Sequence, residues 1–165
     1  MDRAEAFEAA LKLQPGKTAL VVVDMQRGFL DPGEVMEVPP ARDIVPRIRS
    51  LLDLFRDRGL PVLFTEFTYS ECAPLLVGEL HPEHRKPAPG APRGLTHLVL
   101  TGTMTDICVL ATVVGGMNRE YRMTVVEDAT ATLSPEIQRA SLDIIRRAYG
   151  RVLSTGQVFE EVAGW

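Results

Sequence analysis

An uninterrupted apolar run, TALVVVD, occupies residues 18–24 and constrains the fold more than any other feature of the sequence. If the run is extended, apolar side chains face both of its sides. Valines dominate it, which is typical of a strand buried on both faces of a parallel sheet. We therefore expect residues 18–24 to form a central strand that ends in the carboxylate of Asp24. Parallel strands need long crossover connections, usually helices, so strands and helices should alternate along the chain.

The rest of the chain shows this alternation. Four more segments are typical of strands: 60–67, 96–102, 122–129 and 151–158. Apolar residues at helical spacing predict three helices, over 41–59, about 107–118 and 134–150. Ser134 suits the N-cap of the last helix, and Pro135 suits its first position. The pattern predicts an α/β fold of three layers, in which helices cover both faces of a mostly parallel sheet.

The interval between Phe67 and His97 breaks the alternation. It is rich in proline and glycine, and only the short segment PLLVGEL within it could form a turn of helix or strand. A parallel connection needs a helix-sized crossover, and a long loop without structure is uncommon in a compact domain. We infer that an element of the expected alternation is short or missing here.

Composition limits the number of domains and the kinds of partner. A chain of 165 residues with 45% hydrophobic residues can bury one core, so we expect one domain over 1–165. A formal charge of -4 and a pI near 5.4 argue against a nucleic-acid or anionic-membrane surface. No stretch resembles a signal peptide or a membrane span, so we expect a cytoplasmic protein. In that reducing compartment Cys72 and Cys108 should remain free thiols.

Asp24 and Cys108 both follow predicted strands. Ligands of open α/β sheets bind outside the carboxyl ends of the strands, so both residues could lie in a binding cleft. Cys108 would lie near the start of a helix, where the positive end of the helix dipole favours the thiolate. This chemistry is that of a nucleophile. From the residues alone, Cys108 could also be a small buried hydrophobe, and Asp24 a turn carboxylate.

Three segments carry a resemblance to a known family. ALVVVDMQRGFLDPG (19–33) and LVLTGTMTDICVLATVV (98–114) resemble the two signature segments of the isochorismatase-like cysteine hydrolases, and the similarity continues through YRMTVVEDATAT (121–132). The resemblance implies a mostly parallel six-stranded sheet. It also implies a triad of Asp, Lys and Cys that cleaves C–N bonds in small amides, ureides or carbamoyl compounds. Isochorismatases proper hydrolyse a vinyl ether instead, and this activity is the alternative among enzymes.

The resemblance also implies roles for individual residues. Cys108 matches the nucleophile, and Asp24 matches the acid/base that takes the thiol proton and gives a proton to the departing nitrogen. The backbone amides of Met104 and Cys108 would form the oxyanion hole, beside a cis peptide bond between Thr103 and Met104. Phe29 would line the substrate pocket, and ordinary loop packing is the alternative for it.

The lysine of the triad has no clear counterpart in this chain. The lysines are Lys12, Lys17 and Lys86. The first two precede the first predicted strand, and Lys86 lacks the strand before it and the helix after it that the family pattern has. We therefore expect one edge strand and its helix to be absent between about Arg93 and Leu95. Because a nearby ammonium would stabilise the thiolate, we predict a catalytically weak enzyme or an inactive family member.

The remaining candidates have simpler interpretations. His81 and His84 are spaced like metal ligands, but no third ligand accompanies them, so we expect a solvated loop, no metal ion and no cofactor. Asp106 is interpreted as a helix cap rather than a base, and Cys72 as packing or an exposed thiol. We expect a small-molecule substrate, which the sequence does not identify. We also expect a homo-oligomer, a dimer or tetramer, because relatives usually associate and a missing edge strand would expose apolar surface.

Overall fold

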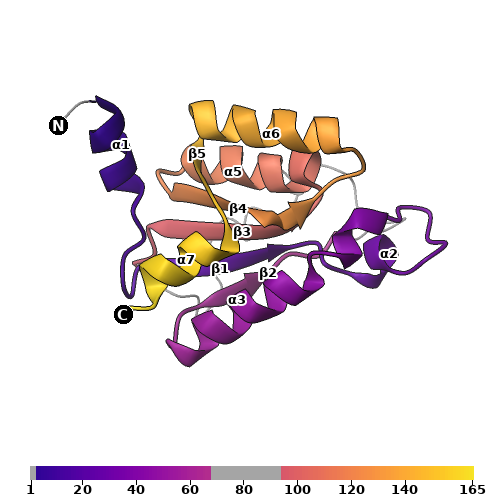
Figure 1. The fold of residues 1–165 in the computed structure, drawn as a ribbon, viewed down its shortest axis with the longest axis horizontal. Helices are drawn as coiled ribbons and strands as arrows, with labels where there is room; N and C mark the ends of the chain where they lie inside the picture. The colour runs from indigo at the N-terminus through magenta and orange to yellow at the C-terminus, as the bar shows by residue number, and fades with distance from the viewer. Residues whose placement is uncertain (1–2, 68–93) are drawn as a thin grey trace, which may run out of the picture.

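A five-stranded parallel sheet lies at the centre of this computed structural model, which describes residues 3–67 and 94–165 (Figure 1). The strands are β1 (Thr18–Val23), β2 (Val62–Phe64), β3 (His97–Thr103), β4 (Arg122–Ala131) and β5 (Gly150–Leu153). They pair in the order β2-β1-β3-β4-β5, and every pairing is parallel. The predicted α/β fold is confirmed, and within the described residues the sheet has five strands where the resemblance implied six.

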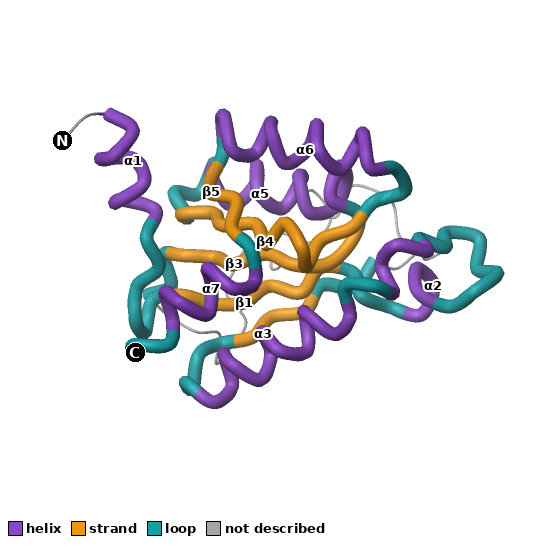
Figure 2. The backbone as a smooth tube through the Cα atoms, in the orientation of Figure 1, coloured by secondary structure: helices purple, strands orange, loops and turns teal. Residues whose placement is uncertain are grey.

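Helices cover both faces of this sheet (Figure 2). On one face lie α3 (Val45–Asp57) and α7 (Thr155–Val162), and on the other lie α5 (Leu110–Met117) and α6 (Pro135–Ala148). The shorter elements are α1 (Arg3–Leu11), α2 (Arg27–Leu30), the 3-10 helix η1 (Pro39–Arg42) and the π-helical turn η3 (Thr105–Val109). No helix in the described residues is long and apolar enough to cross a membrane.

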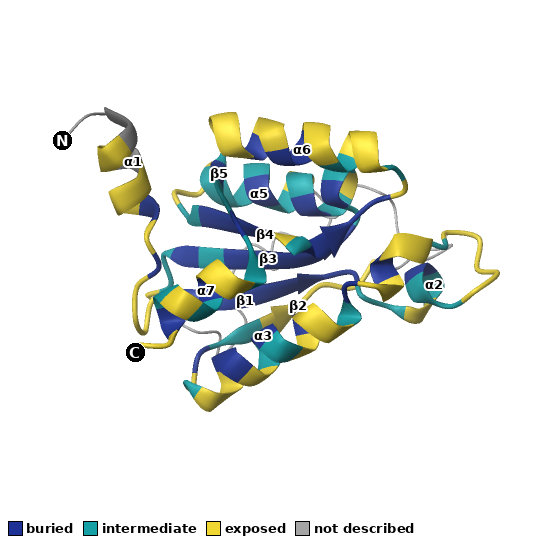
Figure 3. Cartoon of the chain, in the orientation of Figure 1, coloured by how far each residue is buried: buried dark blue, intermediate teal, exposed yellow. Residues whose placement is uncertain are grey.

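β1 is buried on both faces, as the apolar run predicts. Leu20 and Val22 pack into the core under α3 and α7, whereas Val21 and Val23 pack into the core under α5 and α6. Every residue of the strand is buried, and Figure 3 shows similar burial along much of β3 and β4. Two-sided burial is the reason that β1 lies inside the sheet, between β2 and β3.

The strand predicted at 151–158 is wrong in its second half. β5 ends before Ser154, which begins α7 with a capping box: its hydroxyl accepts from the Gln157 N–H at 3.2 Å, and its own N–H donates to the Gln157 side chain at 2.8 Å. Val158 and Val162 are both buried in α7. A Ser-x-x-Gln capping box followed by apolar residues four apart favours a helix, and this local chemistry decides the segment.

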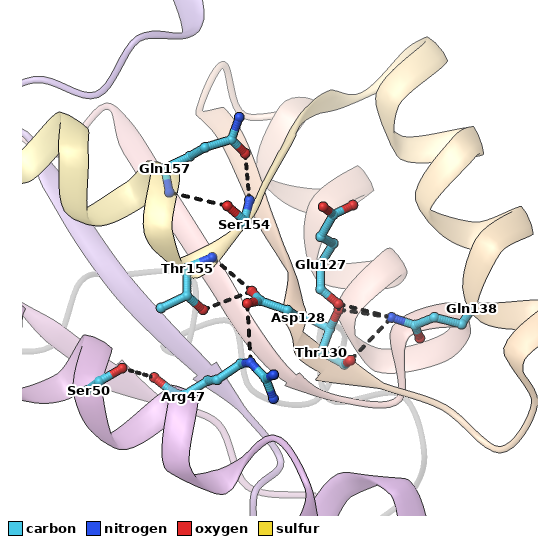
Figure 4. Close-up of polar contacts among 9 residues, drawn as sticks. All are labelled: Arg47, Ser50, Glu127, Asp128, Thr130, Gln138, Ser154, Thr155 and Gln157. Atoms are coloured by element: carbon cyan, nitrogen blue, oxygen red, sulfur yellow. Dashed lines mark hydrogen bonds and ion pairs between the residues drawn. The ribbon is translucent and has the colours of Figure 1, made fainter.

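Polar contacts hold the start of α7 against β4 and α3 (Figure 4). The Asp128 carboxylate of β4 accepts hydrogen bonds from the N–H and the hydroxyl of Thr155, both at 2.8 Å. The same carboxylate lies 3.2 Å from the Arg47 Nε on α3. From the opposite face, the Gln138 amide of α6 donates to the Thr130 carbonyl oxygen at 3.2 Å. β4 is therefore the strand to which helices of both faces are joined.

Several helices and strands begin or end at other residues than the sequence predicts. The predicted helix 41–59 divides into η1 and α3, because Pro46 occupies the first turn of α3 and cannot continue a preceding helix. The predicted strand 60–67 contains only the short β2, and the helix predicted from about 107 is preceded by η3. Ser134 caps α6 as predicted, since its hydroxyl accepts from the Ile137 N–H at 3.3 Å.

Several residues discussed from the sequence lie outside the described residues. They are Cys72, His81, His84, Lys86 and Arg93, together with the segment PLLVGEL at 74–80. Their interpretations stay predictions.

Candidate active site

The strand order reverses between β1 and β3. β2, which follows β1 in the sequence, lies on one side of β1, and β3 lies on the other side. Ligands of open α/β sheets bind at such a reversal, outside the carboxyl ends of the strands. Asp24 directly follows β1, and Cys108 lies in η3, which follows β3. The structure therefore brings these two sequence-derived candidates to one edge of the sheet.

Gly102 allows β1 and β3 to approach closely at this edge. It pairs in register with Val23, and a Cβ atom at position 102 would lie 2.0 Å from the Val23 carbonyl oxygen. Its φ of 108° also lies in the region that favours glycine. Glycine at this position therefore lets the segment that carries Cys108 lie beside the end of β1.

Asp24 is held by a residue at the end of β2. Asp24 is only 4% exposed and has a left-handed φ of 50°. The Thr65 hydroxyl donates to Asp24 Oδ1 at 2.6 Å. The Asp24 N–H lies 3.2 Å from the Thr65 hydroxyl oxygen and 3.3 Å from the Thr65 carbonyl oxygen. Both the backbone and the carboxylate of Asp24 are thus fixed by Thr65.

Cys108 lies in a π-helical turn that leads into α5. The Val109 N–H donates to the Met104 carbonyl oxygen at 3.0 Å, five residues back along the chain. The Thr112 hydroxyl donates to the Cys108 carbonyl oxygen at 2.7 Å. The Cys108 side chain is half-buried and packs against the core under α5 and α6. Single π turns within helices are frequent at functional sites.

The pKa of the Cys108 thiol is raised to about 11. Burial is the largest cause, followed by the hydrogen bond and the negative charge of Asp24. The Met104 N–H lowers the pKa, and the charge of Asp106 raises it further. The raised pKa is opposite to the shift expected from the start of a helix, because burial and the carboxylates of Asp24 and Asp106 disfavour the thiolate. At neutral pH the nucleophilic form requires transfer of the thiol proton.

The Thr103–Met104 peptide bond is cis, at the position that the resemblance implies. Thr103 is buried, and its hydroxyl donates to the Ala131 carbonyl oxygen at the end of β4, at 3.1 Å. A hydrogen bond from the Met104 backbone lowers the pKa of the Cys108 thiol. The oxyanion hole implied by the resemblance stays a prediction.

Asp106 does not cap a helix, contrary to the prediction. No side chain caps η3. The Asp106 carboxylate instead accepts a hydrogen bond from the hydroxyl of Thr132, which directly follows β4. This contact joins η3 to the end of β4.

The cavities that the described residues line include two at the same edge of the sheet. The smaller, of about 210 Å³, is lined in part by Gln26, Phe29 and Phe67. The centroids of the two phenylalanine rings lie 6.3 Å apart. The Gln26 side-chain amide accepts a hydrogen bond from the Phe67 N–H at 2.8 Å and donates one to the Phe67 carbonyl oxygen at 2.9 Å. The larger, of about 320 Å³, lies between η1, the end of β4 and the start of α6. Neither of these two cavities is lined by Asp24 or Cys108.

Within residues 3–67 and 94–165, neither a lysine nor a metal cluster accompanies Asp24 and Cys108. Lys12 and Lys17 both precede β1, toward the amino end of the strand. In that part of the chain no group of three or more His, Cys, Asp or Glu side chains could hold a metal ion.

Three polar residues at this edge, Gln26, Thr65 and Thr132, are not among the residues predicted from the sequence. Thr65 and Thr132 directly follow β2 and β4, and Gln26 lies two residues after Asp24. Polar residues that follow parallel strands meet at one edge of the sheet, and this rule could have singled them out. Their partners cannot be read from spacing, because Thr65 and Asp24 lie 41 residues apart in the sequence.

A family model described as the isochorismatase domain matches residues 18–93 and, separately, residues 91–157. The two matches meet where the sequence predicts that a strand and its helix are missing. Ureidoacrylate amidohydrolase RutB of Caulobacter segnis is 25% identical over 202 residues, which cover 87% of this chain and 84% of the relative. This alignment is longer than the whole chain, so the relative has residues without a counterpart here.

Another relative and two solved structures are also similar to this chain. A protein of Arabidopsis thaliana named "probable inactive nicotinamidase" is 29% identical over 168 residues, with 76% of this chain and 86% of the relative covered. The crystal structure of a cysteine hydrolase from Pseudomonas syringae pv. phaseolicola superposes with a TM-score of 0.78 at 22% identity, over 93% of this chain and 95% of that chain. A pyrazinamidase/nicotinamidase from Streptococcus mutans gives 0.69 at 20% identity, over 82% and 99% of the two chains. These structures share the fold.

Proposed function

The chain belongs to the isochorismatase family, and from this membership we propose that it is a cysteine hydrolase that cleaves the C–N bond of a small amide, ureide or carbamoyl compound. One observation carries the proposal: Asp24, Cys108 and the Met104 N–H lie together where the strand order reverses between β1 and β3. A relative named as a ureidoacrylate amidohydrolase supports the class of bond.

In the proposed first half-reaction, Cys108 attacks the substrate carbon while Asp24 takes the thiol proton. Because burial and Asp24 raise the pKa of the Cys108 thiol, its proton must move to Asp24 for the sulfur to attack. The backbone N–H groups of Met104 and Cys108 stabilise the oxyanion of the tetrahedral intermediate. Protonated Asp24 then gives its proton to the nitrogen as the C–N bond breaks, which leaves a thioester on Cys108.

In the second half-reaction, water hydrolyses this thioester. Asp24 is again ionised, and it takes a proton from the attacking water. When the C–S bond breaks, the same proton returns to the Cys108 sulfur. One carboxylate therefore serves both halves, and the thiol and the carboxylate are restored at the end of the cycle.

A catalytically impaired family member is the second candidate. Burial and the charge of Asp24 raise the pKa of the Cys108 thiol, so the nucleophilic thiolate is scarce at neutral pH. The alignment with the amidohydrolase relative is longer than this chain, and the plant relative is named as inactive. The two candidates share one site and differ in the rate that it supports.

The proposed function is tested with the purified 165-residue chain on nicotinamide, pyrazinamide and ureidoacrylate, with substrate loss followed by chromatography. We expect slow hydrolysis of at least one compound, and we expect Cys108→Ala and Asp24→Asn to abolish it. Cys72→Ala is the control for general effects of removing a thiol, and it should hydrolyse at the wild-type rate.

Equal hydrolysis by wild type and Cys108→Ala would refute the proposed mechanism. No hydrolysis of any compound, with a Cys108 thiol that is alkylated no faster than a buried unactivated thiol, would favour the impaired member.

We also propose that the protein acts on its small-molecule substrate as a homo-oligomer, a dimer or tetramer, in the cytoplasm. Leu63 and Phe64 on β2 are 38% and 61% exposed, and apolar surface of this kind favours association. Cys108 is a free thiol, and a reducing compartment would preserve it.

A further inference from the structure

Thr65 contacts both the backbone and the side chain of Asp24. Its hydroxyl oxygen lies 3.2 Å from the Asp24 N–H and donates to Asp24 Oδ1 at 2.6 Å. The Asp24 carbonyl oxygen accepts from the Gln26 N–H at 2.8 Å, so the backbone is held on both sides of the residue. A single hydroxyl therefore acts on the left-handed backbone and on the carboxylate at the same time.

We propose that Thr65 is the positioning residue that keeps the Asp24 carboxylate against the Cys108 thiol. This inference rests on the role proposed above for Asp24. A carboxylate that is only 4% exposed needs hydrogen-bond donors in place of water. The Thr65 hydroxyl supplies a neutral donor, which fixes the carboxylate without adding charge beside Cys108.

We expect Thr65 to act on Cys108 through Asp24. Among the described residues, the charged groups that raise the pKa of the thiol are Asp24 and Asp106, and Thr65 is not among the groups that shift it. Asp106 is held separately by the Thr132 hydroxyl, on the other side of β3. Removal of the Thr65 hydroxyl should therefore release Asp24 and leave Asp106 in place.

The position of Thr65 makes this effect separable from folding. Thr65 is an exposed residue that directly follows β2. Replacing it with valine keeps its shape and removes only the hydroxyl, so little core packing changes. Thr65→Ser keeps the hydroxyl and removes only a methyl group.

The test measures the alkylation rate of Cys108 by iodoacetamide as a function of pH, with Cys72→Ala as the background. We expect Asp24→Asn to raise the rate at neutral pH, because it removes the charge that holds the thiol pKa high. We expect Thr65→Val to raise the alkylation rate as well, by a smaller factor than Asp24→Asn. Thr65→Ser should be alkylated at the same rate as the Cys72→Ala protein. Each unit by which the pKa falls gives about tenfold more thiolate.

The matched control is Thr124→Val, which removes a buried threonine hydroxyl that has no hydrogen-bond partner among the described residues. It should leave the alkylation profile unchanged, and unfolding temperatures of all variants report general damage. An unchanged or slower rate in Thr65→Val overturns the proposal, since Asp24 would then stay in place without the hydroxyl. Alkylation needs no turnover, so a Thr65→Val effect without any hydrolysis would refute the proposed function and leave the positioning role intact.

Discussion

Burial shifts the pKa values of two side chains in opposite directions. It raises the pKa of Cys108 and lowers that of His97, since in both residues the charged form loses hydration. His97 begins β3 and is fully buried, with its Nδ1 2.8 Å from the Thr96 hydroxyl oxygen. The positive charge of Arg122 lowers its pKa further.

The lowered pKa of His97 predicts that the protein loses stability below about pH 6.5. The unfolded chain binds a proton near the ordinary pKa, whereas the folded chain resists it, so the free energy of unfolding falls as the pH falls from 6.5 toward the folded pKa. The contribution of this group is at most about 1.4 kcal/mol per pH unit and is absent above pH 6.5. Urea unfolding at several pH values measures it.

His97→Gln is the comparison variant for this measurement. It removes the titrating group, and the carboxylates contribute equally to both proteins. The difference in stability between wild type and His97→Gln should therefore shift in favour of the variant as the pH falls. A difference that stays constant from about pH 8 to pH 5 would contradict the argument.

At the scale of elements, the site depends on the close approach of β1 and β3. The substitution Gly102→Ala tests this dependence. It would place a Cβ atom 2.0 Å from the Val23 carbonyl oxygen, at a residue whose φ is 108°. We expect it to destabilise the fold by at least about 2 kcal/mol, because the strands must separate. Gly59→Ala is the control: its φ is 62° but its Cβ meets open space, and we expect a loss of about 1 kcal/mol. Equal losses in urea unfolding would show that the strand contact is unimportant.

The start of α7 depends on its capping box. Ser154→Ala removes the hydroxyl that accepts from the Gln157 N–H, and we expect it to lower the free energy of unfolding by about 1 kcal/mol. Ser50→Ala is the matched control, because the Ser50 hydroxyl only donates to the Arg47 carbonyl oxygen within α3. Urea unfolding of both variants checks this, and an equal effect would mean that the cap does not stabilise α7.

At the scale of the whole molecule, β2 is the edge strand of the described sheet. Among the described residues β2 pairs only with β1, and Leu63 and Phe64 on it are 38% and 61% exposed. The family match divides at residues 91–93, after β2 and before β3. The apparent loss of sequence therefore falls in the connection that leaves this edge strand.

We predict that edge strand β2 forms part of the interface of the proposed oligomer. Light scattering should give two or four times the chain mass of 18.2 kDa, and Phe64→Lys should shift the protein toward the monomer, because a buried unpaired charge opposes association. Ile144→Lys on α6, at a site that is 41% exposed, is the control and should leave the mass unchanged. A monomeric wild type, or dissociation by Ile144→Lys alone, would contradict the prediction.

Much of the fold follows from patterns within short segments. The two-sided apolar run of β1 predicts a central strand, and Ser134 with Pro135 predicts the start of α6. The same kind of signal, the Ser154 capping box, is present before α7, where the sequence analysis expected strand. The expectation of a strand fails there because it continues the apolar run of β5 past Ser154, although the capping box is a local signal that favours a helix.

By itself, the sequence determined that Asp24 and Cys108 follow buried parallel strands, and hence that both belong to one edge of a sheet. Only the tertiary structure decided that β1 and β3 are neighbours, that Thr65 holds Asp24, and that the pKa of Cys108 is raised. Strand direction follows from local connections, whereas neighbours, burial and the distance between charges depend on which distant segments pack together. The same packing set the ionisation of the thiol, against the direction expected from its place at a helix start.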